Sequence, residues 1–164
     1  MRRAALFSLA ALFALSSTAC GSDSEGDGAT SGDSSGGAVS TSASALCVDL
    51  INKHRASIML PPYKRWEDAE VCSGEQAKSD AASEIPHDAF SKCGEFAQNE
   101  CPGWPGKPEE IIGGCLQRMW DEGPGEDFLQ HGHFLNMSSE EYTMVACGFF
   151  ETEDGQVWAI QNFK

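Results

Sequence analysis

The sequence predicts a layered α+β domain, and two observations carry that prediction. Segments with helical periodicity come first, between residues 46 and 120, and two strand-like segments, 145–150 and 156–163, come last. The two strand-like segments flank Asp154-Gly155, a dipeptide that is typical of a tight hairpin turn. Helices followed by an antiparallel hairpin indicate helices packed against a sheet.

Three helices are expected before the hairpin. The first is 46–60, which carries an apolar face at helical spacing on Leu46, Leu50, Ile51, His54 and Ile58. Residues 66–82 and 108–120 are the other two. The segment between them, 85–108, is rich in Pro, Gly and Cys, and we expect it to form loops pinned by disulfides.

The first nineteen residues have the features of a signal peptide. Arg2 and Arg3 precede an apolar run, 4–15, and small residues follow as far as Ala19. The run is too short to span a bilayer, which takes about 20 apolar residues. We therefore expect residues 1–19 to be removed and the chain to be exported.

Cys20 follows the small residues directly, where a bacterial lipoprotein has its lipidated cysteine. Cysteine counting favours lipidation, because seven cysteines leave six once Cys20 is set aside. Ordinary cleavage after Ala19 is the alternative, since small residues also suit a signal peptidase. The sequence thus predicts a cell-envelope or surface lipoprotein that is attached to its membrane only through Cys20, or a secreted protein if Cys20 is not lipidated.

The six remaining cysteines fit three disulfides in an exported chain. Six cysteines allow fifteen pairings, and the sequence does not choose among them. The six are Cys47, Cys72, Cys93, Cys101, Cys115 and Cys147.

Composition separates a tether from a folded domain. Residues 20–45 consist mainly of Gly, Ser, Asp, Thr and Ala, with almost no large apolar side chain. Such a segment cannot bury enough surface to offset its conformational entropy, so we expect a flexible tether after the lipidated cysteine. Residues 46–164 remain as one domain of ordinary size.

The chain is strongly acidic, with 11 Lys and Arg against 25 Asp and Glu and a formal net charge of −14. Loss of Arg2 and Arg3 with the signal peptide makes the charge more negative still. This balance argues against a nucleic-acid partner and against electrostatic docking on anionic lipid. A negative charge of this size is compatible with the binding of cations in general.

Short motifs along the domain occur in a recognisable order. They are His87, Gly94-Glu95, Trp120-Asp121-Glu122, Gly132-His133-Phe134-Leu135-Asn136-Met137 and Ala146-Cys147-Gly148. In this order the chain resembles the CAP superfamily, which comprises cysteine-rich secretory proteins, antigen 5 and pathogenesis-related 1 proteins and is also called SCP-like extracellular. The resemblance implies an α-β-α sandwich with a central antiparallel sheet over residues 46–164.

The resemblance also implies a central cleft with two histidines and two glutamates. By position these are His87, His133, Glu95 and Glu122. Two facing imidazoles are natural ligands for Zn²⁺ or a similar divalent ion. Carboxylates nearby can orient the rings. We therefore expect His87 and His133 to bind the metal, with Glu95 and Glu122 behind them.

Three functions are open for such a cleft. The one we favour is a binding or interaction module that holds a divalent metal, with protein partners that the sequence does not name. A metal-assisted hydrolase would use Glu95 or Glu122 as general base, although the sequence carries no established catalytic motif. Lipid or sterol binding would need an apolar groove, for which the candidates are Ile111, Ile112, Phe90 and Phe128.

Overall fold

The structure is a computed structural model that describes residues 41–164. The predicted signal peptide, the predicted lipidation site Cys20 and nearly all of the predicted tether lie outside the described residues. Within the described part of the chain, no helix combines the length and the apolar character that crossing a membrane requires.

Four strands of the described residues form one sheet in the order β1-β3-β4-β2. Their bounds are Lys64–Arg65 for β1, Ala97–Pro105 for β2, Met144–Glu151 for β3 and Gln156–Phe163 for β4. β4 pairs antiparallel with both β3 and β2, whereas β1 adds a two-residue parallel edge beside β3. The predicted hairpin is confirmed, and Gly155 in its turn has a φ of 78° that suits glycine.

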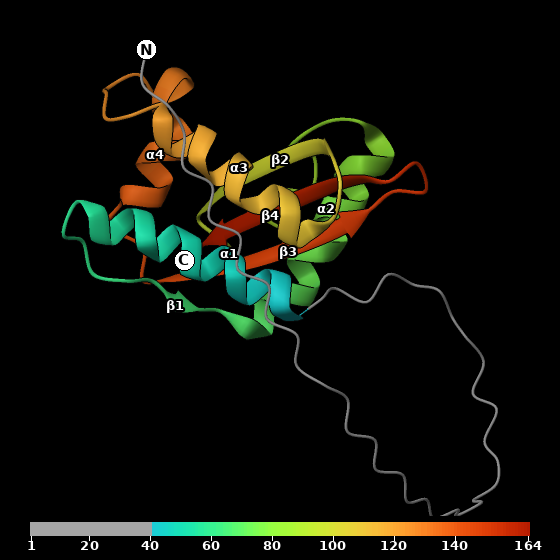
Figure 1. The fold of residues 1–164 in the computed structure, drawn as a ribbon, viewed down its shortest axis with the longest axis horizontal. Coiled ribbons are helices and arrows are strands. Elements are labelled where there is room, and N and C mark those ends of the chain that lie inside the picture. Colours follow the sequence, from blue (N-terminus) through green and yellow to red (C-terminus); the bar gives the residue numbers. More distant parts are fainter. Residues whose placement is uncertain (1–40) are drawn as a thin grey trace, which may run out of the picture. The chain divides into compact units, whose positions relative to one another are not determined.

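Helices cover both faces of this sheet (Figure 1). α2 (Glu70–Ser83), preceded by the short 3₁₀ turn Glu67–Ala69, lies along β3 and β4 on one face. α1 (Thr41–Ser57) and α3 (Pro108–Asp121) lie on the other face, and α4 (Phe128–Ser138) packs against both of them. The predicted α-β-α sandwich is therefore confirmed.

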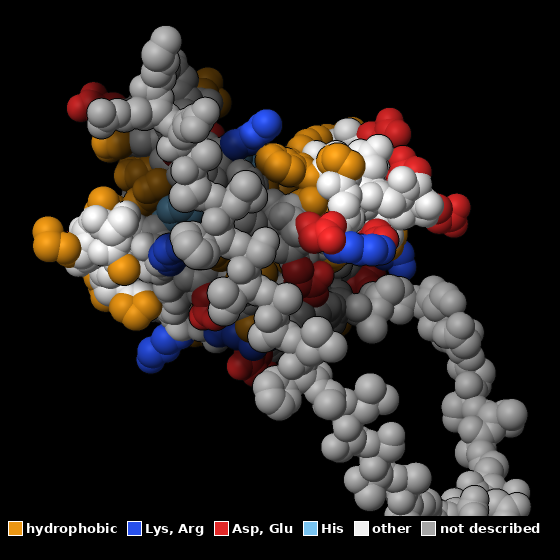
Figure 2. All heavy atoms as spheres, viewed as in Figure 1, with side chains coloured by type: hydrophobic (Ala, Val, Ile, Leu, Met, Phe, Trp, Pro, Cys, Tyr) orange, Lys and Arg blue, Asp and Glu red, His pale blue; other side chains and the backbone are white. Residues whose placement is uncertain are grey.

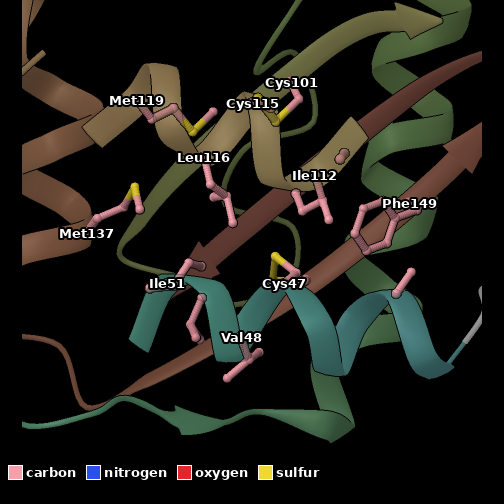
Figure 3. Close-up of a cluster of buried hydrophobic side chains, with 14 of the residues drawn as sticks. Cys47, Val48, Ile51, Cys101, Ile112, Cys115, Leu116, Met119, Met137 and Phe149 are labelled. Carbon is pink, nitrogen blue, oxygen red and sulfur yellow. A yellow bond between two sulfur atoms is a disulfide. The ribbon is translucent and has the colours of Figure 1, made fainter. Parts of the chain in front are cut away.

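The main core lies between the sheet and the two helices α1 and α3 (Figure 3). Leu116 of α3 is fully buried there, and burial of one such side chain contributes about 1.5–3 kcal/mol. From α1, the side chains of Cys47, Val48 and Ile51 face this core, whereas Ile58 of the predicted face is 43% exposed. Leu46, Leu50 and Ile51 of the predicted face do pack on the core, and the disulfide from Cys47 to β3 ties this side of α1 to the sheet.

α1 begins at Thr41, five residues before the predicted helix start at Leu46. Ala43 and Ser44 are fully buried, and the Ser44 hydroxyl donates a 2.8 Å hydrogen bond to the carbonyl oxygen of Cys147. These small residues resemble the tether in composition, so only the packing against β3 shows that they belong to the fold.

α2 lies so close to β3 that one position of the strand requires glycine. A Cβ atom at Gly148 would lie 2.2 Å from the backbone nitrogen of Gly74 and 2.2 Å from the carbonyl carbon of Ser73. Real Cβ atoms do not approach backbone atoms so closely, so Gly148 sets the separation between α2 and the sheet.

The sequence does not reveal β2, which occupies part of the segment predicted as loops. The strand pairs with β4 in regular register from Ala97 to Cys101, and the register then shifts before Trp104. Two prolines and a glycine after Cys101 gave this segment the composition of a loop. An edge strand tolerates them, because one of its sides needs no ladder hydrogen bonds.

α4 is also absent from the sequence prediction. It begins at Phe128 and is capped by Asp127, whose carboxylate accepts a hydrogen bond from the backbone N–H of Leu129 at 3.0 Å. This side-chain cap satisfies one of the free N–H groups at the helix start. Gly132 in the middle of the segment weakened the helical signal.

Three disulfides tie the layers together, as predicted. Cys47–Cys147 joins α1 to β3, Cys101–Cys115 joins β2 to α3, and Cys72–Cys93 joins α2 to the α2–β2 loop, residues 84–96. The structure thus selects one pairing out of the fifteen. Disulfides persist in oxidising compartments, so these three fit an exported protein.

Candidate metal-binding cleft

Two histidines from different elements line one small cavity. His87 lies in the α2–β2 loop, and His133 lies on α4. The cavity has a volume of about 180 Å³, and its remaining lining residues are Gln98, Phe128, Leu129, Gly132 and Asn136. The structure therefore brings together the two histidines that were paired from the sequence.

His133 is held by direct contact with Glu122, which was predicted to lie behind the metal ligands. Nδ1 of His133 lies 2.5 Å from a carboxylate oxygen of Glu122, and the backbone N–H of His133 donates to the other oxygen at 3.0 Å. A carboxylate only accepts hydrogen bonds, so Nδ1 carries a proton, and in the neutral ring Nε2 then carries the lone pair. No described residue makes a hydrogen bond to that Nε2.

His87 has an unusual backbone conformation, with a φ of 64° in the left-handed region. Residues with a Cβ atom rarely adopt this region, so the surroundings must hold it. The backbone N–H of His87 donates to Glu100 at 2.7 Å, and its Nδ1 lies 2.8 Å from the amide oxygen of Gln98. The His87 side chain is 42% exposed, which leaves the ring open to solvent.

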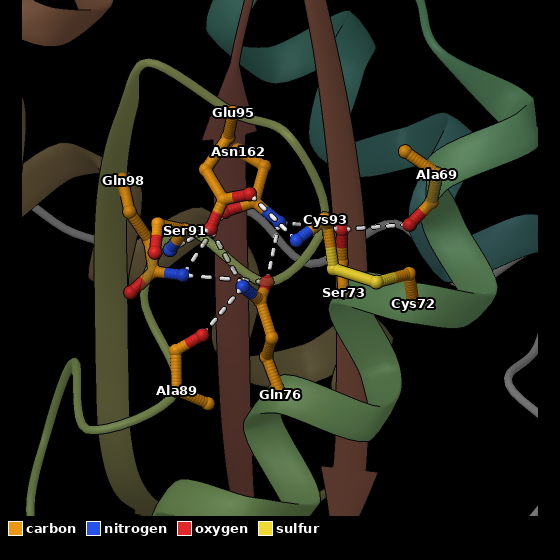
Figure 4. Close-up of a disulfide and its surroundings, with 10 residues drawn as sticks. All are labelled: Ala69, Cys72, Ser73, Gln76, Ala89, Ser91, Cys93, Glu95, Gln98 and Asn162. Atoms are coloured by element: carbon orange, nitrogen blue, oxygen red, sulfur yellow. Dashed lines mark hydrogen bonds between the residues drawn. A yellow bond between two sulfur atoms is a disulfide. The ribbon is translucent and has the colours of Figure 1, made fainter.

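Glu95 is buried and contacts neither histidine in the described structure. Its carboxylate accepts hydrogen bonds from the side chain of Gln76 at 2.6 Å and from the backbone N–H groups of Ser91 and Cys93 at 2.7 and 2.9 Å (Figure 4). Glu95 thus anchors the α2–β2 loop beside its disulfide. Amide side chains, which sequence reasoning missed, lie between Glu95 and His87.

A buried carboxyl pair below His87 was also missed. Asp80 is fully buried and Glu100 is 4% exposed. Burial, assisted by the nearby Asp80 carboxyl and opposed by the N–H of His87, raises the pKa of Glu100 to about 8. Burial raises the pKa of Asp80 as well, and Asp80 accepts a 2.7 Å hydrogen bond from the backbone N–H of Ala89. Nothing in the sequence marks this pair, because the two acids come from separate elements.

The other two histidines of the chain take part in packing and do not line the cavity. The ring of His54 stacks on Trp120 with the centroids 5.0 Å apart. Nδ1 of His131 lies 2.7 Å from the carbonyl oxygen of Glu122. His131 lies on α4 and ties that helix to the preceding turn.

An apolar groove of about 310 Å³ adjoins the cavity. Phe90, Phe96 and Phe128 line it and are 41%, 68% and 60% exposed. The groove and the cavity share His87, Gln98, Phe128 and Asn136. Ile111 and Ile112, the other two candidates for an apolar groove, are buried in the core and line no part of it.

The outer surface and the cavity wall differ in their charged side chains. On the face seen in Figure 2, acidic side chains gather on the side of the domain that carries the β3–β4 turn. The cavity wall itself contains no Asp, Glu, Lys or Arg. Among residues 41–164, no group of three or more His, Cys, Asp or Glu side chains is placed to hold a metal ion. The cavity therefore offers two imidazoles, and an ion there would need water or a ligand to complete its coordination.

The structure is a disulfide-stabilised domain with helices on both faces of a mainly antiparallel sheet, and its disulfides fit an exported protein. The chain belongs to the cysteine-rich secretory protein (CAP) family, whose sequence model matches residues 48–163. The resemblance seen in the motifs is thus confirmed.

The comparison with the solved structure of Na-ASP-1 agrees at the level of the fold. The crystal structure of Na-ASP-1 is similar with a TM-score of 0.53 and 10% identity, over 85% of this chain and 43% of that one. The structure of Schistosoma mansoni venom allergen-like protein 4 gives a TM-score of 0.46 and 12% identity, over 76% and 90% of the two chains. This chain therefore spans less than half of Na-ASP-1. No curated protein sequence matches it.

Proposed function

We propose that this extracellular CAP domain is a binding module that holds a divalent metal ion, with Zn²⁺ the first candidate, through His87 and His133. The supporting observation is that both histidines line one cavity while their Nδ1 atoms are engaged by acceptors behind them. Imidazole nitrogen suits Zn²⁺, Cu²⁺ and Ni²⁺. A bound ion would supply a Lewis-acidic centre for an oxygen or nitrogen donor of a ligand.

Titration of the full chain with ZnCl₂ in a calorimeter tests the proposal. We expect one Zn²⁺ to bind at neutral pH, and binding to weaken in acid, because protons compete for imidazole nitrogen. The variant His87→Ala/His133→Ala should lose this binding. The control His54→Ala/His131→Ala removes the same number of imidazoles but none from the cavity wall. This control variant should still bind Zn²⁺. Unchanged affinity in the His87/His133 variant contradicts the proposal.

The apolar groove supports a second candidate, binding of a lipid or sterol. Three exposed phenylalanines in one groove beside the cavity are unusual on a soluble surface and favour an apolar ligand. A fluorescent sterol or fatty acid should bind the wild-type chain, and Phe96→Ser should weaken that binding. Val71→Ser, at a residue of α2 that is 74% exposed but lines neither cavity nor groove, is the control. Equal binding by all three proteins would count against this candidate.

The geometry gives less support to a hydrolase. A general base must reach the proton that it removes. Glu95 is 5% exposed and accepts hydrogen bonds from three groups of the protein. Glu122 accepts from the ring and the backbone of His133, and neither carboxylate lines the cavity.

Attachment through Cys20 remains our proposal for localisation. The six cysteines of residues 41–164 all pair with one another, which leaves Cys20 outside the disulfides. Growth with an alkyne fatty acid should label the wild-type protein and leave Cys20→Ala unlabelled and released from the membrane. Labelling of Cys20→Ala, or a wild-type protein found only in the medium, contradicts the anchor.

A further inference from the structure

We propose that a buried chain of three amide side chains fixes His87 as its Nδ1–H tautomer, so that Nε2 carries the lone pair. The three amides are Gln76, Asn162 and Gln98, which we call the amide relay; they are 2%, 0% and 7% exposed (Figure 4). The inference deepens the proposed function, because Nε2 would be the metal-binding atom. The tautomer itself does not depend on a metal.

The first amide of the relay is oriented by groups that can only accept hydrogen bonds. Nε2 of Gln76 lies 2.6 Å from the Glu95 carboxylate and 2.9 Å from the carbonyl oxygen of Ala89. The same carboxylate also accepts from the N–H groups of Ser91 and Cys93, as a hydrogen-bond acceptor should. The NH₂ group of Gln76 must therefore face these acceptors, and its oxygen must face Asn162.

The second amide is oriented from two independent sides. The Ser73 hydroxyl donates its single proton to the carbonyl oxygen of Ala69 at 2.9 Å, so Oγ is left to accept. Nδ2 of Asn162 donates to this Oγ at 2.9 Å and to the Gln76 oxygen at 2.6 Å. The oxygen of Asn162 is thereby turned towards Gln98.

The third amide passes this orientation to the histidine. Nε2 of Gln98 donates to the Asn162 oxygen at 3.0 Å and lies 3.4 Å from the Gln76 oxygen. The Gln98 oxygen therefore faces His87, 2.8 Å from Nδ1. An amide oxygen cannot donate, so Nδ1 must carry the proton.

Glu95 thus supports the relay at Gln76, beside the independent support of Asn162 by Ser73, whereas Glu122 contacts His133 directly. We assign the three amides as positioning residues. The result is the same at both histidines: Nδ1 is protonated and Nε2 is free. A neutral imidazole without a directing partner populates both tautomers, and only one of them offers Nε2 to a metal.

The tautomers can be read directly from the imidazole ¹⁵N shifts of the ¹⁵N-labelled full chain, in long-range ¹H–¹⁵N spectra without metal and at a pH where the rings are neutral. The wild type should show a protonated Nδ1 and an unprotonated Nε2 at His87. Gln98→Met should show both tautomers at His87. His133, which is held by Glu122, should keep a protonated Nδ1 in every variant and serves as control for the fold.

Two further variants test the relay behind Gln98. Gln76→Met leaves the Asn162 oxygen facing Gln98, and Asn162→Leu leaves the Gln76 oxygen, so each alone should keep the Nδ1–H tautomer. The double variant removes both acceptors and should give a mixture of tautomers. If the double variant does not fold, the Gln98→Met spectrum decides the question.

Two results overturn the inference. One is an Nε2–H tautomer at His87 in the wild type. The other is a His87 ring that stays entirely in the Nδ1–H form in Gln98→Met. That result would show that the Glu100 carboxyl, 3.7 Å from Nδ1, sets the tautomer.

Zn²⁺ titration of the same samples separates this inference from the proposed function. We expect Gln98→Met to weaken binding by about 10- to 100-fold. If the wild type shows the expected tautomer but does not bind Zn²⁺, the proposed metal-binding function is wrong and the inference about the relay stands.

Discussion

The guanidinium carbon of Arg55 lies 3.6 Å from the ring centroid of Tyr63, and the Arg55 residue is only 1% exposed. Both side chains end at the C-terminus of α4. Arg55 donates 2.8 Å hydrogen bonds to the carbonyl oxygens of Met137 and Ser139, and the Tyr63 hydroxyl lies 2.7 Å from the latter oxygen. A cation suits the negative end of a helix dipole. The pair therefore fixes the helix that carries His133.

Replacing Arg55 should be costly for stability. Arg55→Met keeps most of the length of the side chain but removes the Arg55 donor from the carbonyl oxygens of Pro61, Met137 and Ser139, of which only that of Ser139 keeps a second side-chain donor, the Tyr63 hydroxyl. We expect the free energy of unfolding to fall by about 2–4 kcal/mol, measured by urea denaturation. Arg118→Met is the control, since Arg118 lies on the surface over Trp104. Its effect should stay within about 1 kcal/mol, and equal losses in the two variants would contradict this role of Arg55.

Two glycine substitutions should act in opposite directions. Gly148→Ala places a methyl group against the backbone of α2, and we expect it to lower the free energy of unfolding by about 1–3 kcal/mol or more. Gly113→Ala adds a methyl group inside α3, at an ordinary 3.8 Å from Leu50, and should raise stability by about 0.5–1 kcal/mol. Thermal unfolding followed by circular dichroism measures both. A stable Gly148→Ala would show that α2 does not lie against β3 as described.

The buried carboxyl of Glu100 should make stability fall as the pH rises. Its pKa in the folded protein is about 8, well above the value of an exposed glutamate, so the folded state holds this proton where the unfolded state has lost it. The contribution of the Glu100 proton to the free energy of unfolding is complete below about pH 4.5. It declines towards pH 8, with a slope of at most about 1.4 kcal/mol per pH unit. Urea denaturation between pH 5 and pH 9 should show a decline that Glu100→Gln flattens. If stability declines equally in Glu100→Gln, the decline is caused by other titrating groups.

The disulfides should differ in how much each stabilises the folded protein. Cys47–Cys147 spans 100 residues, whereas Cys101–Cys115 spans 14. In the chain-entropy account the longer loop stabilises by about 4.7 kcal/mol and the shorter by about 3 kcal/mol. All four cysteines are buried, so replacing either pair by alanine removes a similar volume from the core. We expect the Cys47→Ala/Cys147→Ala protein to unfold at lower urea concentration, and the reverse order would contradict the entropic account here.

Local patterns predicted the parts of the fold that depend on nearby residues. Helix α3 follows from its proline start and its apolar spacing, and the β3–β4 hairpin follows from Asp154-Gly155. β2 escaped prediction because its residues Gln98, Asn99 and Glu100 are polar yet buried. Such residues can be buried in a strand only if partners from distant elements satisfy them, and those partners are not visible in sequence.

The candidate site, like the fold, has features that the sequence predicts and others that only the tertiary structure reveals. The sequence by itself predicted a site made of His87, Glu95, Glu122 and His133, because the short motifs around them resemble those of the family. Only the tertiary structure decided how they act. It placed Glu122 against His133 but separated Glu95 from His87 by the amide relay, because hydrogen-bond direction is set by groups that converge from α2, β2 and β4. It also chose the disulfide pairing, since that choice depends on which cysteines folding brings within bonding distance.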